Sequence, residues 1–273
     1  MQAGDRAFVD ALRDDDTSGA TAIVSRTAIF LAGRRRDHDD LLEVAEACAA
    51  AQPAMAGLRT VLKIARDSGD PTDALRHLVE RLVRAPHQIA RHASDVLRLG
   101  LEPQGGGLPM LTLVTSSASA AVRETCLMLS QHVDLKVCCA ESRPKCEGAA
   151  LAGDLAAAGL RVELFSDAGI SVGLPGSQAV VIGADAVGPD AFINKVGSAA
   201  LCALASTMGI PVYVLAGREK LLSTGEFGGI ELRASSETVT DARGAVYLRN
   251  EAIFERISRH LVSQFITDAG PIA

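Results

Sequence analysis

Five short aliphatic runs, separated by longer segments of helical character, are the feature of this sequence that most constrains its fold. The runs are residues 109–115, 135–140, 161–165, 179–183 and 211–215. Each has the length of a strand that is buried on both faces, and the segments between them favour helices. Strands that alternate with helices form parallel sheets through right-handed crossovers. We therefore expect an α/β protein whose second half is an open parallel sheet.

The helices expected around these strands include residues 145–158, 191–208 and 250–266. In the last of these, large apolar residues recur at every fourth position from Ile253 to Phe265. This spacing is typical of an amphipathic helix.

Before the first run, the chain has a helical pattern from about residue 5 to residue 98, with leucines at three- and four-residue steps. We expect four or five short helices that pack as a bundle. Residues 99–108 (LGLEPQGGGL) form the clearest linker. The sequence thus predicts an N-terminal helical domain, residues 1–104, and a sheet domain, residues 105–273.

Charge and composition argue against nucleic-acid binding. The net charge is −6, basic residues are scattered except for the run Arg34–Arg36, and there is no Trp. A protein that binds a phosphate backbone normally concentrates basic residues on one face, and a single-strand binder stacks bases on aromatic rings. The basic run is better explained as the C-terminal end of a helix. Direct nucleic-acid binding is therefore disfavoured.

Other residue patterns indicate a cytoplasmic protein without metal or cofactor. The six cysteines form no CxxC pair and most lie in apolar runs, as free thiols of a reducing compartment do. No basic-then-apolar leader opens the sequence, and no uncharged run approaches the length of a membrane span. The six histidines lack metal-ligand spacing, and GxGxxG and P-loop motifs are absent.

Small and polar residues follow all five runs. In an open parallel sheet, ligands bind beyond the carboxyl ends of the strands, so these residues should converge on one region. After the first run, the hydroxyl residues are Thr115, Ser116, Ser117 and Ser119. They could receive a phosphate at the start of the next helix, although such hydroxyls also cap helices in the absence of a ligand.

Charged residues at the later strand ends extend the expected site. Arg143 could bind a phosphate or carboxylate, or form a surface ion pair. Asp185 follows a buried strand, where a carboxylate is costly unless it is used or paired, so a functional role is favoured. Asn194 and Lys195 are expected to open a helix, where the lysine could hold an anion or face solvent. Lys220 has the same two interpretations.

An ordered series of motifs runs through the second half of the chain. It comprises ESRPKCEG at 141–148, VIGADAVGPDAFINKVGS at 181–198, GIPVYV at 209–214 and NEAIFE at 250–255. The series resembles the translation initiation factor 2B alpha/beta/delta family, which includes methylthioribose-1-phosphate isomerase and ribose-1,5-bisphosphate isomerase. The resemblance is strong over residues 110–270 and thinner before them.

This resemblance implies an N-terminal helical domain on a Rossmann-like C-terminal domain, and a homodimer formed through the latter. The isomerases of the family convert a phosphorylated aldose to a ketose with a Cys after the first strand and the Asp of "GAD". Asp185 matches that Asp, and Ser117 stands where the Cys is expected. By the same resemblance, contacts to a substrate phosphate would come from Gly19, Ala20, Arg143, Asn194, Lys195 and Lys220.

The departures from the family pattern concern the thiol and two arginines. A thiol exchanges protons near neutral pH far more readily than the hydroxyl of Ser117. Ser18 and Gln52 replace two family arginines, and both changes remove a permanently charged partner for phosphate. Part of the expected anion site is therefore missing.

Three functions remain open at this point. The sequence favours a protein that binds a sugar phosphate or nucleotide, without catalysis or with altered activity, because the thiol and arginines are absent. The second is an active aldose–ketose isomerase, which the retained Asp185, Asn194 and Lys195 favour. The third is a regulatory subunit similar to a translation factor.

Overall fold

The computed structural model of the chain describes residues 1–15, 18–33, 37–102, 107–232 and 234–272. The basic run Arg34–Arg36 and part of the glycine-rich linker lie outside the described residues.

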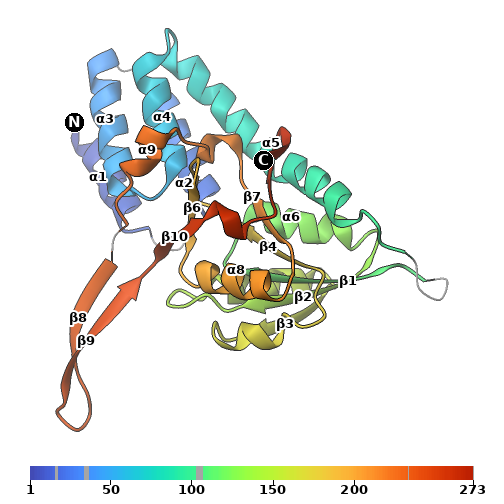
Figure 1. Cartoon of the computed structure of the whole chain (residues 1–273). Helices are drawn as coiled ribbons and strands as arrows, with labels where there is room; N and C mark the ends of the chain where they lie inside the picture. The colour runs from blue at the N-terminus through green and yellow to red at the C-terminus, as the bar shows by residue number, and fades with distance from the viewer. Residues whose placement is uncertain (16–17, 34–36, 103–106, 233, 273) are drawn as a thin grey trace.

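Helices form the first part of the described chain, as expected (Figure 1). They are α1 (Ala3–Arg13), α2 (Ala20–Ala32), α3 (His38–Ala51), α4 (Ala56–Asp67) and α5 (Pro71–Leu97). Their inward faces meet in one cluster of Leu, Val, Ile and Ala side chains. α5 has 27 residues and is not short. Its first half packs in the bundle and its second half packs on the sheet, so this helix connects the two cores.

The second part contains a large parallel sheet. Its strands are β1 (Met110–Ser116), β2 (Asp134–Ala140), β3 (Arg161–Phe165), β4 (Ala179–Gly183), β7 (Val212–Leu215), β11 (Gln264–Thr267) and β12 (Gly270–Ile272). Their order is β12-β11-β7-β4-β1-β2-β3, and only β12 runs antiparallel to its neighbour. The five expected strands are present, and the fold class is confirmed. The direction of winding reverses between β1 and β4, where a crevice for a ligand is expected.

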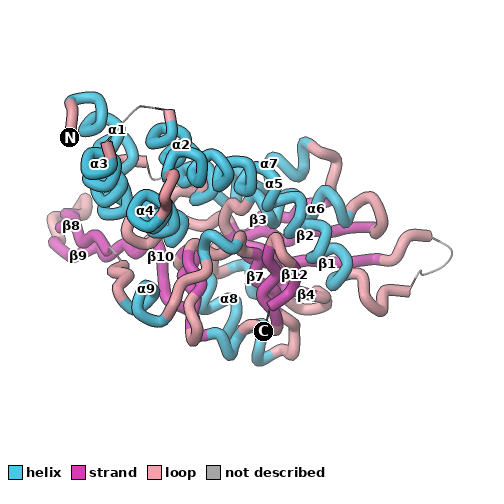
Figure 2. Tube along the Cα trace, turned by 90° about the horizontal axis from the view of Figure 1, so that it is seen from above, coloured by secondary structure: helices cyan, strands magenta, loops and turns pink. Residues whose placement is uncertain are grey.

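Helices cover both faces of this sheet (Figure 2). α5, α6 (Ala120–Leu129) and α7 (Glu147–Ala157) pack on one face, and α8 (Ser198–Thr207) packs on the other with the short helix η1 (Gly169–Val172). Because side chains alternate along each strand, a strand contributes to the packing on both faces of the sheet. In β4, Val181 packs with α5, α6 and α7 on one face, whereas Val180 and Ile182 pack with α8 and η1 on the other.

Two expected helices were wrong in whole or in part. The segment 191–208 begins with a strand, β6 (Ala191–Lys195), and only its second part is helix α8. β6 is the middle strand of a small antiparallel sheet with β5 (Ala186–Val187) and β10 (Phe254–Ser258). Phe192 and Ile193 are fully buried in this strand and pack in different clusters, which a single helix face cannot do.

The segment 250–266 is not a helix. It contains the end of β9 (Val246–Ala252), then β10, the short helix η3 (Arg259–Leu261) and most of β11. Ile257 on β10 and Phe265 on β11 are buried in the same core from two different strands, so their spacing does not reflect one helix face. Pairing of β10 with β6 and of β11 with β7 determines the structure here, and a four-residue period does not reveal such long-range contacts.

A hairpin projects from the body of the molecule next to the small sheet (Figure 1). It consists of β8 (Ala234–Thr240) and β9, and it exposes Val246, Tyr247 and Leu248. Before it lie the short helices η2 (Arg218–Lys220) and α9 (Thr224–Gly228). Within the described ranges, every helix is too short or too polar to cross a bilayer.

Candidate functional site

A cavity of about 480 Å³ lies between the helical bundle and the carboxyl edge of the large sheet. Its floor comes from the loops that follow β1 and β4, on either side of the reversal in strand order. Its opposite wall comes from Arg13, Asp15, residues 18–22 and residues 52–55 of the bundle, and the start of α7 closes one side. The cavity thus occupies the place where a doubly wound sheet binds its ligand.

Most of the site residues predicted from the strand ends, from the start of an expected helix or from the family resemblance line this cavity. They are Gly19, Ala20, Ser116, Ser117, Ser119, Asp185, Asn194, Lys195 and Lys220. Thr115 and Arg143 do not line it. Thr115 is buried, and the exposed Arg143 guanidinium pairs with Glu141 at 2.9 Å. Arg143 thus forms a surface ion pair, which was the alternative interpretation of this residue.

Asp185 is held by backbone bonds from both sides. Its carbonyl accepts from the Ala56 N–H (3.1 Å) at the start of α4, and its own N–H donates to the Ile193 carbonyl (2.8 Å). No described residue forms a hydrogen bond with its carboxyl group, which borders the cavity. Burial raises the pKa of this carboxyl group, while Lys220 and then Lys195 lower it and Glu147 raises it further.

The two cavity lysines have different partners. The Lys220 ammonium donates to the Ala184 carbonyl at 2.7 Å. Lys195 is only 3% exposed and lies on β6 rather than on a helix, which corrects the expectation for Asn194 and Lys195. Its Nζ atom donates to Glu147 Oε1 at 2.5 Å. Glu147 therefore neutralises Lys195 inside the site.

The hydroxyl-rich loop after β1 has a constrained backbone. Ser117 has a φ of 62°, in the left-handed region that is costly for residues other than glycine. Its N–H donates to Ser142 Oγ at 2.6 Å, and the Ser142 N–H donates in turn to the Asp167 carboxylate. Strain of this kind is common at functional sites.

Two neighbouring serines have different roles. Ser119 caps α6 by accepting from the Val122 N–H, as the capping interpretation predicted. Ser116 is 7% exposed, and its Oγ atom has no hydrogen-bond partner among the described residues. A buried hydroxyl normally has a partner, so Ser116 leaves a donor and acceptor for a bound group.

The N-terminus of α2 also faces the cavity. Gly19 is the N-cap and provides no side-chain cap, so among the described residues the N–H groups of Ala20 and Thr21 have no partner. Such a helix end favours an anion. Gln52 lines the same region, but its amide donates to the carbonyls of Leu12 and Asp15, both at 2.9 Å.

Sequence reasoning missed the role of Glu147. It belongs to the ESRPKCEG motif, and the signal was its place shortly after the second strand. Its ion pair was hidden because Lys195 was expected on a helix. Across the parts of the chain that the structure describes, no group of His, Cys, Asp and Glu could hold a metal ion.

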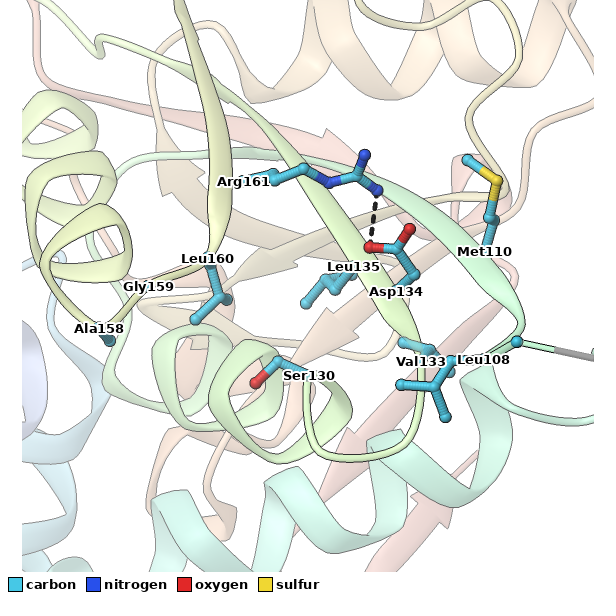
Figure 3. Close-up of a pocket in the computed structure, with 11 residues that line it drawn as sticks. Leu108, Met110, Ser130, Val133, Asp134, Leu135, Ala158, Gly159, Leu160 and Arg161 are labelled. Atoms are coloured by element: carbon cyan, nitrogen blue, oxygen red, sulfur yellow. Dashed lines mark ion pairs between the residues drawn. The ribbon is translucent and has the colours of Figure 1, made fainter.

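A second depression lies at the opposite edge of the sheet (Figure 3). It surrounds the starts of β1, β2 and β3, and its charged residues Asp134 and Arg161 already pair with each other at 2.8 Å. It therefore lies away from the carboxyl ends of the strands, and its charges are satisfied.

Curated relatives of the chain are sugar-phosphate isomerases by name. Ribose 1,5-bisphosphate isomerase from Methanocaldococcus jannaschii is 25% identical in an alignment of 228 positions that covers 81% of this chain and 73% of that protein. Methylthioribose-1-phosphate isomerase from Thermosipho africanus is 30% identical in an alignment of 294 positions, gaps included, that covers 96% of this chain and 84% of that protein.

Solved structures share the fold at lower sequence identity. The translation initiation factor eIF-2B of Pyrococcus horikoshii OT3 aligns with a TM-score of 0.84 at 20% identity, covering 100% of this chain and 98% of that one. A 5-methylthioribose 1-phosphate isomerase from the same organism aligns with a TM-score of 0.64 at 19% identity, covering 98% and 84%. The model of one family, IF-2B, matches residues 10–273, almost the whole chain. On this match, the chain belongs to the initiation factor 2 subunit family.

Proposed function

We propose that this chain is an aldose–ketose isomerase that acts on a phosphorylated sugar. The observation that carries the proposal is Asp185, a carboxyl group with a raised pKa that lines the cavity near two lysines. A carboxyl group that keeps its proton closer to neutral pH can act as both acid and base. The relatives that bear the names of sugar-phosphate isomerases support the same chemistry.

The reaction on a sugar 1-phosphate requires no oxidant. The bond between C1 and the ring oxygen O4 breaks, the hydrogen on C2 passes to C1 with its electron pair, and C2 becomes a carbonyl carbon. O4 gains a proton and the C2 hydroxyl loses one, so atoms and charge balance. In the proposed role, protonated Asp185 donates to O4 and its carboxylate then accepts the proton of the C2 hydroxyl.

The phosphate would bind where donors lack a protein partner. The N–H groups of Ala20 and Thr21 at the start of α2 provide two such donors, and the buried Ser116 hydroxyl provides a third. Lys220 adds positive charge without a carboxylate within ion-pair distance among the described residues. Together these groups would replace part of the missing arginine charge.

Turnover of methylthioribose 1-phosphate and ribose 1,5-bisphosphate, followed by NMR, tests this proposal. We expect Asp185→Asn to lower turnover by about a hundredfold or more, because it removes the acid and base. Asp190→Asn, at an exposed acid outside the cavity, should leave turnover unchanged. The absence of ketose product from the wild-type protein with both substrates would refute the proposal.

Binding without turnover is the second candidate. It is favoured by Ser117, which has a hydroxyl where the family has a thiol. It is also favoured by Gln52, which replaces a family arginine and whose amide N–H groups already donate to the carbonyls of Leu12 and Asp15. Under this candidate, sugar phosphates would raise the melting temperature of the wild-type protein by mass action while no product forms. Ser117→Cys should then create turnover, since the thiol supplies a proton-exchanging group. Product formation by the wild-type protein would exclude this candidate.

A further inference from the structure

The cavity carries a balanced set of charges. Of the residues that the structure describes, the cations that line it are Arg13, Arg123, Lys195 and Lys220. The acids that line it are Asp15, Glu147, Asp154 and Asp185. A site that binds a highly charged anion normally presents an excess of cations. This cavity has no such excess.

Most of these cations already have carboxylate partners. Arg13 pairs with Asp10 at 2.6 Å, and Arg123 approaches Asp154 at 3.6 Å. Both pairs are exposed and therefore weak, so a ligand can displace them. Lys195 and Glu147 differ, because their side chains are only 4% and 17% exposed. Breaking this pair would leave an uncompensated charge in the interior.

Glu147 also has an unused acceptor. Its Oε2 atom is buried and has no hydrogen-bond partner among the described residues. A carboxylate oxygen accepts hydrogen bonds and cannot donate them, so the group it can bind is a hydroxyl or another donor. A phosphate in the same position would be repelled by like charge. The residue therefore distinguishes a hydroxyl from a phosphate.

We propose that Glu147 determines ligand specificity by limiting the charge that the cavity accepts. Glu147 holds Lys195 in a buried ion pair, so this lysine is not available to bind a second phosphate. The Oε2 atom of Glu147 can accept a hydrogen bond from a sugar hydroxyl. The cavity therefore prefers a sugar with one phosphate and a hydroxyl group near Glu147 over a sugar with two phosphates. The inference rests on the proposed function only in that the cavity binds a sugar phosphate. It does not require turnover.

Calorimetric titration with ribitol 1-phosphate and ribitol 1,5-bisphosphate tests the inference, since these alditols lack the aldose centre and cannot isomerise. We expect the wild-type protein to bind the monophosphate about tenfold more tightly than the bisphosphate. Glu147→Gln keeps the shape of the side chain and frees Lys195, so it should raise bisphosphate affinity about tenfold relative to monophosphate affinity. A matched control is Glu163→Gln, which breaks another Lys–Glu pair, with Lys136, outside the cavity. It should leave the ratio unchanged.

The inference is overturned if the wild-type protein binds both alditols equally, or if Glu147→Gln changes the ratio no more than Glu163→Gln does. Should Glu147→Gln fail to fold, the double variant Glu147→Gln/Lys195→Met removes both charges of the buried pair and strands neither. It must lose the wild-type preference for the monophosphate, because the carboxylate that repels a second phosphate is gone. If neither alditol binds the wild-type protein or Glu147→Gln, the premise that the cavity binds a sugar phosphate fails, and the charge limit fails with it. Equal affinity of the wild-type protein for the two alditols leaves that premise standing and overturns only the charge limit.

Discussion

Asp185 carries a cost in stability that depends on pH. Burial raises the pKa of its carboxyl group in the folded protein above the value in the unfolded chain. The folded state therefore binds the proton more tightly, and stability falls as pH rises from the ordinary value of an aspartate to the raised one. Below the ordinary value this cost is absent, and above the raised value it is complete.

We accordingly expect Asp185→Asn to raise the melting temperature at neutral pH and to have little effect below about pH 4, where the aspartate is protonated in both states. Thermal unfolding of the wild type and the variant across this pH range measures the difference. Asp190→Asn, at an exposed position, serves as the control. An equal difference at acid and neutral pH would show that burial of the charge is not its cause.

Individual site residues could be predicted from the sequence where a place directly after a strand was enough to bring the residue to the cavity. Asp185 and the serines after β1 were found because ligand-binding residues follow parallel strands. Arg143 follows β2 in the same way, yet its guanidinium pairs with Glu141 outside the cavity. Side-chain direction depends on local partners, which the position of a residue after a strand does not determine.

Among the secondary-structure elements, α7 depends on the absence of a side chain at its start. A Cβ atom at Gly148 would overlap the carbonyl oxygen of Ala140, at the end of β2. Because the obstacle is backbone, it cannot rotate away. This close approach fixes the first turn of α7, which carries Glu147, against the sheet.

Gly148→Ala should destabilise the protein by about 3 kcal/mol, at the upper end of the usual cost of overpacking. Gly153→Ala in the same helix is the matched control, since nothing lies within 4 Å of its Cβ position. It should stabilise by roughly 0.5–1 kcal/mol through helix propensity. Denaturant unfolding of both variants measures these changes. Equal effects of the two substitutions would contradict the role assigned to Gly148.

The strands and helices that were predicted correctly share one property: the residue pattern within each segment is sufficient to identify it. Four of the five expected strands, β1, β2, β4 and β7, are mainly apolar runs, and their burial in the sheet produces the pattern directly, whereas the edge strand β3 is largely exposed. β6 and β10 instead depend on antiparallel pairing with each other across about 60 residues of chain, as with Ile193 and Arg256. Apolar residues at helical spacing therefore did not distinguish these strands from helices.

The whole molecule is organised around the junction between the bundle and the sheet. α5 contributes Leu75 and Leu82 to the bundle core, and Ile89 and Leu97 to the sheet core. The Ala56 N–H reaches the Asp185 carbonyl, and Thr60 Oγ1 donates to the Glu219 carbonyl at 2.8 Å. The predicted boundary between residues 104 and 105 and the predicted homodimer stay predictions. What the geometry does show is that the two parts line one cavity.

A ligand in this cavity should protect both parts of the molecule from hydrogen exchange at once. The amides at residues 19–22 lie on the bundle side, and those at residues 116–120 and 183–185 lie on the sheet side. Binding favours the closed, folded arrangement of all three segments, so their exchange should slow together. Exchange followed by mass spectrometry with saturating ribitol 1-phosphate measures this, and the projecting hairpin at residues 234–252 is an internal control that should not change. If only the sheet segments slowed, the bundle would not contact the ligand, and the shared cavity would not be the binding site.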